Sequence, residues 1–135
     1  IGTDVKGIVH SLTTTNAAVA DVTQMPELMH GQEREWYGDR AYWNERDRKY
    51  ARSQGIRYRV QRRTTAGKPL TEHQREINRK RSQIRARGEH PFHVVKRLWG
   101  HAKVRYRGLA KNTTQLFALF ALSNLYLLRH RLAAA

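Results

Sequence analysis

The sequence predicts an α/β fold in which an antiparallel pair of strands leads into further strands and helices that pack on a sheet. Short stretches of apolar and β-branched residues with rough alternation are typical of strands. Asn and Thr capping signals open several helices between and after them. The resulting order is strand, strand, helix, strand, helix, strand and then helices. With 135 residues, the chain has the size of one domain.

The N-terminal segment is predicted to form a hairpin. Residues 1–4 have the pattern of the end of one strand, and residues 7–15 (GIVHSLTTT) form the next strand after a turn at residues 5–7. Asp21 is then placed to cap a helix that extends to about residue 30.

The middle of the chain alternates between strands and a helix. Residues 34–37 (REWY) predict a short strand. Asn44 is the expected N-cap of a helix over residues 44–54. Residues 56–60 (IRYRV) alternate apolar and basic side chains, as a half-buried strand does, and a polar turn follows at residues 62–69.

Helices dominate the remaining sequence. Thr71, with Gln74 as its capping-box partner, opens a long helical segment to about residue 88. A second segment extends from Pro91 to about Trp99. Proline is tolerated in the first turn of a helix, so we expect a break before it.

The last predicted helix begins at Asn112 and ends at about Leu132, after a basic loop at residues 101–111. Residues 116–128 are apolar except for two polar side chains. This run has 13 residues, whereas a membrane-spanning helix needs roughly 20. A core helix that is buried on most sides is therefore the better interpretation.

Basic residues outnumber acidic ones by 26 to 11, which gives a net charge of +15. The excess is uneven, because residues 1–45 have a net charge of −4 and residues 46–135 one of +19. A basic excess of this size is typical of proteins that bind a polyanion, most often nucleic acid. An anionic membrane and the RNA of a structural assembly are the competing partners.

The absence of cysteine excludes disulfides and thiolate metal sites, and it is compatible with a reducing cytoplasm. The N-terminus has neither the basic nor the apolar segment of a secretory signal. Because it also lacks an initiator Met, we expect the chain to be a fragment or a processed piece.

Three acidic residues lie at the ends of predicted elements. Asp4 ends the first strand, Asp39 follows the strand at residues 34–37, and Glu89 lies near a helix break. If the two strands are neighbours, their aspartates meet at one edge of the sheet, where a glutamate from a helix can join them. Such carboxylates suit Mg²⁺, and two ions about 4 Å apart support phosphodiester chemistry.

Each acid also has an ordinary structural interpretation. An aspartate after a strand is commonly a turn residue or a helix cap, and a lone glutamate is commonly a solvated helix residue. Glu89 nevertheless stands out, because residues 75–97 contain eight Lys or Arg and only one other acid, Glu76. A metal ion as its counter-ion would explain an acid in that setting.

The segment RARGEHPFHVVKRLWGHAKVRYRGLAKNTTQLFALFALSNLY resembles the C-terminal part of the catalytic domain of bacterial insertion-sequence DDE transposases of the IS4/IS5-like superfamily. Upstream, IGTDVKGIVHSLTTTNAAVADVTQ and WYGDRAYW resemble the regions of the first and second aspartates. The resemblance covers essentially the whole chain. It implies one catalytic domain over residues 1–135 with an RNase H-like mixed sheet and flanking helices. The N-terminal portion of the full-length protein would be missing and the first strand truncated to residues 1–4.

Carried onto this sequence, the resemblance implies Asp4, Asp39 and Glu89 as the catalytic and metal-binding acids. Mg²⁺ is the implied cofactor, for which Mn²⁺ can substitute. The family signature around the glutamate also matches Arg85 and Lys96, which would hold phosphates that flank the cleaved bond. Arg85 and Glu89 are four residues apart and are therefore expected to share a helix face, and Lys96 returns near that face two turns later if the helix continues past Pro91.

Two positions depart from the family pattern. Ser82 occupies the place of the signature's tyrosine, and Arg40 follows the second aspartate where a small residue is common. Arg40 could pair with a carboxylate or contact DNA. His90 and His93 could indicate zinc, but their interval of three residues with a proline between them disfavours it.

The basic loop supplies Lys103, Arg105 and Arg107 as further candidate DNA-binding residues, with Tyr106 either stacking or packing. The implied activity is metal-dependent phosphodiester cleavage at transposon ends and strand transfer into target DNA. It would be performed by a homodimer on double-stranded DNA, in the bacterial cytoplasm beside the nucleoid, without a membrane or a small-molecule substrate. The alternative is a non-catalytic, basic DNA-binding fragment of a transposase.

Overall fold

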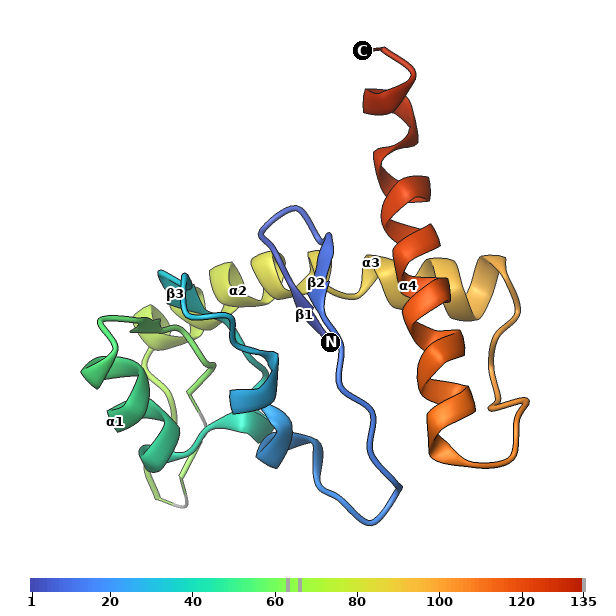
Figure 1. The fold of residues 1–135 in the computed structure, drawn as a ribbon. Helices are drawn as coiled ribbons and strands as arrows, with labels where there is room; N and C mark the ends of the chain where they lie inside the picture. Colours follow the sequence, from blue (N-terminus) through green and yellow to red (C-terminus); the bar gives the residue numbers. More distant parts are fainter. Residues whose placement is uncertain (63, 66, 135) are drawn as a thin grey trace. The chain divides into compact units, whose positions relative to one another are not determined.

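The structure, a computed structural model, describes residues 1–62, 64–65 and 67–134, without the side chains of Asp21 and Val22 (Figure 1). The chain forms two compact units. The terminal unit contains residues 1–29 and the chain from residue 87 onward, and the middle unit contains residues 30–86. The mixture of short strands and helices confirms the predicted α/β class, and the described strands form one two-stranded sheet in each unit.

The middle unit is built on two parallel strands, β3 (Glu35–Trp36) and β4 (Arg57–Tyr58). The pairing extends past the strands, since the amide of Gln61 donates to the carbonyl of Gly38 at 3.2 Å. The end of β3 therefore lies beside the segment that follows β4. Both strands are shorter than the sequence predicts.

The connection between these strands contains two helices, η3 (Arg40–Tyr42) and α1 (Glu45–Ser53). Parallel strands need such a crossover. Asn44 caps α1 as predicted, because its Oδ1 accepts the amide of Asp47 at 2.7 Å. This bond satisfies one of the free amides at the start of the helix.

Aromatic side chains form the centre of the middle unit. The ring of Tyr58 meets those of Trp36 and Trp43 edge to face, at centroid distances of 5.4 and 5.5 Å. Ile56 and Val60 are buried on either side of Tyr58 in the sequence, as the alternating pattern predicts.

Helix α2 (Glu72–Arg87) begins with the predicted capping box. The amide of Thr71 donates to Oε1 of Gln74 at 3.1 Å, and the amide of Gln74 donates to Oγ1 of Thr71 at 3.3 Å. The turn predicted before this helix, at residues 62–69, includes Arg63 and Ala66, which lie outside the described residues.

The terminal unit begins with the predicted hairpin, formed by β1 (Gly2–Thr3) and β2 (Val9–Ser11) in antiparallel pairing. The other edge of β2 is bonded by a side chain. Asn124 accepts from the amide of Val9 at 2.9 Å and donates to its carbonyl at 2.8 Å. The helix that carries Asn124 thus acts as a partner for the strand.

The prediction of one helix over residues 21–30 is wrong. Two short 3₁₀ helices occupy this segment, η1 (Asp21–Gln24) and η2 (Pro26–Leu28). Pro26 has no amide to continue a helix from the preceding turn, so the segment breaks there. The predicted cap by Asp21 lies outside the described side chains.

The C-terminal helices of the terminal unit are α3 (His90–His93), the π-helical η4 (Val94–Leu98) and α4 (Leu109–Leu132). They pack through aromatic pairs. The rings of Phe92 and Phe120 lie 5.4 Å apart at nearly a right angle. The unit thereby gains a core in which η4 contributes two buried valines.

Two predictions for the last helix are wrong. The helix begins at Leu109 rather than Asn112, and it is not buried on most sides. Phe120 and Ser123 are buried, whereas Phe117 and Leu125 are 52% and 56% exposed. None of the described helices has the length and apolar character needed to cross a membrane.

Candidate functional site

Asp4, the first predicted acid, lies in the turn of the β1–β2 hairpin. Its Oδ1 accepts the amides of Lys6 at 2.8 Å and Ile8 at 2.9 Å. These bonds close a side-chain-mediated turn, for which aspartate is well suited. Oδ2 takes part in neither bond, and Asp4 is exposed.

The turn that carries Asp4 is held against the chain just before Glu89. Arg87 donates through Nη1 to the carbonyl of Val5 at 3.0 Å. Gly7 is buried with a φ of 83°, and a Cβ added there would come within 2.4 Å of the Arg87 carbonyl oxygen. Within the terminal unit, the segments of the first and third predicted acids are thus in direct contact.

Glu89 is the N-cap residue of α3, and it is exposed. Helix α2 ends at Arg87, and a turn at residues 88–89 separates it from α3. The prediction that Arg85 and Glu89 share the face of one helix is therefore wrong. The break agrees with the proline at residue 91, which fits the first turn of a new helix.

Asp39, the second predicted acid, directly follows the strand pair of the middle unit and precedes η3. Nη1 of Arg85 lies 3.9 Å from its Oδ2, and both side chains are about two-fifths exposed. An ion pair this long and this solvated contributes little stability. Arg40, which follows Asp39, has an exposed position, and the described ion pair of Asp39 is with Arg85.

Three arginines lie close together beside the same strand ends, namely Arg59, Arg62 and Arg81. Arg81 donates to the carbonyl of Val60 at 2.7 Å. Burial lowers the pKa of the Arg81 guanidinium, and the charges of Arg59 and Arg62 lower it further. Like charges held in this way create a potential that attracts an anion. The alternating pattern of residues 56–60 predicts that Arg59 is a basic residue of a strand. No local sequence pattern predicts that Arg81 lies beside it.

Glu35 offsets part of this positive charge. Its carboxylate accepts the Tyr37 hydroxyl at 2.7 Å and pairs with Arg57 at 2.9 Å and Arg59 at 3.5 Å. The hydrogen bond from Tyr37 and the charges of the two arginines hold the pKa of Glu35 below its usual range despite partial burial. Glu35 is thus an ionised partner of the arginines.

The donor chemistry of Asp4, Asp39 and Glu89 fits Mg²⁺, which prefers carboxylate oxygens. Asp4 and Glu89 belong to the terminal unit and Asp39 to the middle unit. Within the described part of the chain, no group of three or more His, Asp or Glu side chains is arranged to hold a metal ion.

Lys96, in η4, is exposed, and its Nζ lies 5.1 Å from the centroid of the Phe92 ring. This cation–π contact holds the ammonium group at the surface of the terminal unit. His90 and His93 of α3 are exposed as well. All three side chains face solvent, where a polyanion can reach them.

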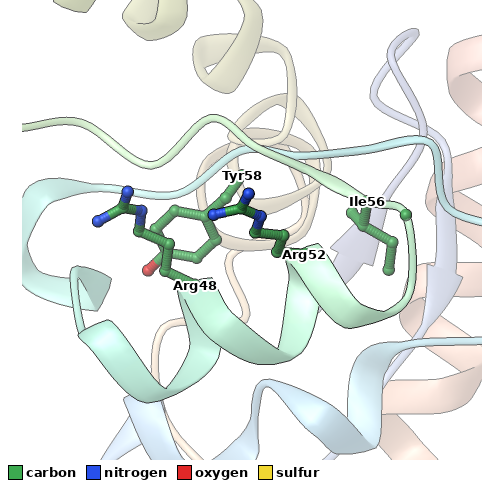
Figure 2. Close-up of a pocket in the computed structure, with 5 residues that line it drawn as sticks. Arg48, Arg52, Ile56 and Tyr58 are labelled. Carbon is green, nitrogen blue, oxygen red and sulfur yellow. The ribbon is translucent and has the colours of Figure 1, made fainter.

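A pocket whose lining contains none of the three predicted acids lies on the middle unit. Figure 2 shows Arg48 and Arg52 of α1 on either side of the Tyr58 ring, with Ile56 at one end. The Tyr58 hydroxyl donates to the carbonyl of Tyr42 at 3.0 Å, so this ring is a fixed part of the core. The pocket adds two more arginines to the basic surface.

The fold and the candidate site are those of an α/β protein with carboxylates after short strands in a strongly basic setting. Residues 1–125 match the family described as Transposase DDE domain. Since the match covers 125 of 135 residues, the chain belongs to this family. No solved structure matches the chain closely enough to be counted as similar.

Proposed function

We propose that residues 1–135 are the catalytic domain of a DNA transposase from a bacterial insertion sequence of the IS4/IS5-like group, with an RNase H-like arrangement. The observation that carries this proposal is the family match over residues 1–125, which includes Asp4, Asp39 and Glu89. The contact between the hairpin turn and Arg87 supports it, because two of the three acids lie on the touching segments.

In this proposal, Asp4, Asp39 and Glu89 are the catalytic residues and hold Mg²⁺, with Mn²⁺ as a substitute. When bound, the metal would supply activation of the attacking hydroxyl and stabilisation of the leaving oxygen. The carboxylates contribute charge and hard oxygen donors.

The basic residues position the substrate. Arg85 can present two parallel donors to a phosphate, and Lys96 contributes a compact charge. In the free protein, Arg85 pairs with Asp39, so contact with DNA would require the guanidinium to turn from that carboxylate to a phosphate. Lys103, Arg105 and Arg107 would extend this contact along the backbone of the DNA.

The proposed reaction consists of two in-line displacements on double-stranded DNA. Water attacks a phosphodiester at a transposon end, and the strand leaves with a free 3′-OH. That hydroxyl then attacks a phosphodiester of the target DNA, so that a new P–O bond forms and the bond to the 3′ oxygen of the target strand breaks. Solvent takes up the proton of each attacking group and protonates each leaving oxygen. Holding the attacking oxygen and the phosphate in line lowers the entropic part of the barrier. A homodimer on DNA, close to the nucleoid in the cytoplasm, would join two ends.

A second candidate function is DNA binding without chemistry. One observation favours it: within the described residues, three acids are not gathered into a metal-binding group. The basic surface would keep its affinity for DNA in that case.

A nicking assay on supercoiled plasmid, with Mg²⁺ or Mn²⁺, separates the two functions. We expect metal-dependent nicking by the chain, and a loss of at least about 100-fold in Asp39→Asn and Glu89→Gln. Plasmid binding should change little, because neither side chain is basic.

Glu72→Gln is the matched control, since Glu72 is an exposed acid in the first turn of α2. It should nick like the unchanged chain. Binding without nicking in either metal would contradict the proposed catalysis and favour the DNA-binding module.

A further inference from the structure

The loop between η4 and α4 exposes basic and apolar side chains in alternation. Residues 103–107 have the sequence KVRYR, and all five are exposed. Val104 is 71% and Tyr106 51% exposed. The sequence left two roles open for Tyr106, packing or stacking. Because its ring is half exposed and not packed into the core of the terminal unit, stacking on a ligand is the role that is left.

The loop has a defined shape despite its exposure. Asn112, which is only 9% exposed, accepts the amide of Tyr106 at 3.2 Å and donates to the carbonyls of Tyr106 at 2.6 Å and Gly108 at 2.7 Å. At the other end, the amide of His101 donates to the carbonyl of Val95 at 3.0 Å. Asn112 thus fixes the backbone that presents the Tyr106 ring to solvent.

Exposed cations and an exposed ring together match a ligand that has both phosphates and flat apolar faces. An anionic membrane offers phosphates and an apolar layer that exposed side chains can enter, but it has no flat faces on which a ring can stack. Nucleic acid offers both, but in a duplex each base face is covered by its neighbours. An aromatic side chain can stack fully only on a base that has left the duplex stack.

We propose that residues 103–107 bind an unpaired stretch of DNA. Tyr106 stacks on a base, the flanking Lys103, Arg105 and Arg107 hold phosphates, and Asn112 is the positioning residue. The inference rests on the proposed DNA function, to which it adds a preference of this loop for unpaired over paired DNA.

The test measures the affinity of the whole chain for a labelled single strand of about 20 nucleotides and for the duplex of the same sequence. Tyr106→Ala should weaken single-strand binding about tenfold and leave duplex binding within about twofold. Tyr106→Phe should retain the single-strand affinity. Tyr50→Ala is the matched control, because Tyr50 is 47% exposed on α1, and it should change neither affinity.

A second measurement tests the role of Asn112. A single strand that contains 2-aminopurine loses fluorescence when the base stacks on a ring, so the unchanged chain should quench it and Tyr106→Ala should not. Asn112→Ala should reduce the quenching while circular dichroism shows the helices intact. If Asn112→Ala unfolds, the Tyr106 variants decide the question by themselves.

Equal loss of single-strand and duplex binding in Tyr106→Ala, or no loss of either, overturns the inference. Metal-dependent nicking that is lost in the acidic variants would still uphold the proposed function in that event. If the unchanged chain binds no DNA, both the proposed function and the inference about residues 103–107 are overturned.

Discussion

Gly7 is the residue on which the position of Asp4 depends most directly. Its φ of 83° is a conformation that only glycine adopts readily. Its missing side chain also lets the turn at residues 4–7 approach the Arg87 carbonyl. The turn and the chain before Glu89 can therefore touch only if residue 7 is glycine.

Gly7→Ala should destabilise the chain by roughly 2–5 kcal/mol, because left-handed strain and a collision with backbone add together. Urea unfolding followed by circular dichroism measures the change. Gly100→Ala is the control, since Gly100 has a φ of 66° in the same unit but open space around it. It should cost only about 1–2 kcal/mol. Equal costs would show that the contact with Arg87 is not needed.

At the scale of the element, α2 illustrates how a helix carries candidate binding residues at a defined place. The reciprocal bonds of Thr71 and Gln74 set its start. Its side chains then meet the segment after β4, where Asn78 exchanges hydrogen bonds with the backbone of Arg62. The helix thus holds Arg81 and Arg85 beside the strand ends of the middle unit.

Thr71→Ala should lower the free energy of unfolding by about 1 kcal/mol, because the amide of Gln74 loses its acceptor. A double-mutant cycle with Gln74→Ala, measured by urea unfolding, checks that the two residues act together. We expect the double variant to lose less than the sum of the single variants. Strict additivity would contradict a functioning capping box.

At the scale of the whole molecule, charge is the dominant property. The positive charge is concentrated in residues 46–135, which supply helices to both units. Many phosphates can therefore be neutralised at once, and each contact releases counterions from the DNA.

Duplex affinity should accordingly fall steeply with salt, by roughly 1000-fold between 50 and 200 mM if about six phosphates are contacted. Fluorescence anisotropy across a salt series gives the slope of log affinity against log salt concentration. Arg105→Ala should make that slope shallower by about one. A slope near zero would exclude a binding mode dominated by phosphate contacts.

Features that depend on neighbours along the chain can be predicted from the sequence alone. Hydrogen bonds between residues a few positions apart form the helix cap at Asn44, the capping box at Thr71 and the β1–β2 hairpin. Patterns of that length can be recognised directly. The family resemblance likewise depends on motifs in order, and the match over residues 1–125 confirms it at the level of the DDE transposase domain.

The partners that side chains find on distant segments follow from packing and have no local signal in the sequence. The sequence predicts that the last helix begins at Asn112, but Asn112 lies inside α4 and bonds the Tyr106 loop. Asn124 completes a strand edge that is 115 positions away in the sequence. Such choices depend on which segments pack together, because a buried amide must bond whatever backbone lies nearest. A local pattern shows that a polar side chain is present, and packing decides its partner.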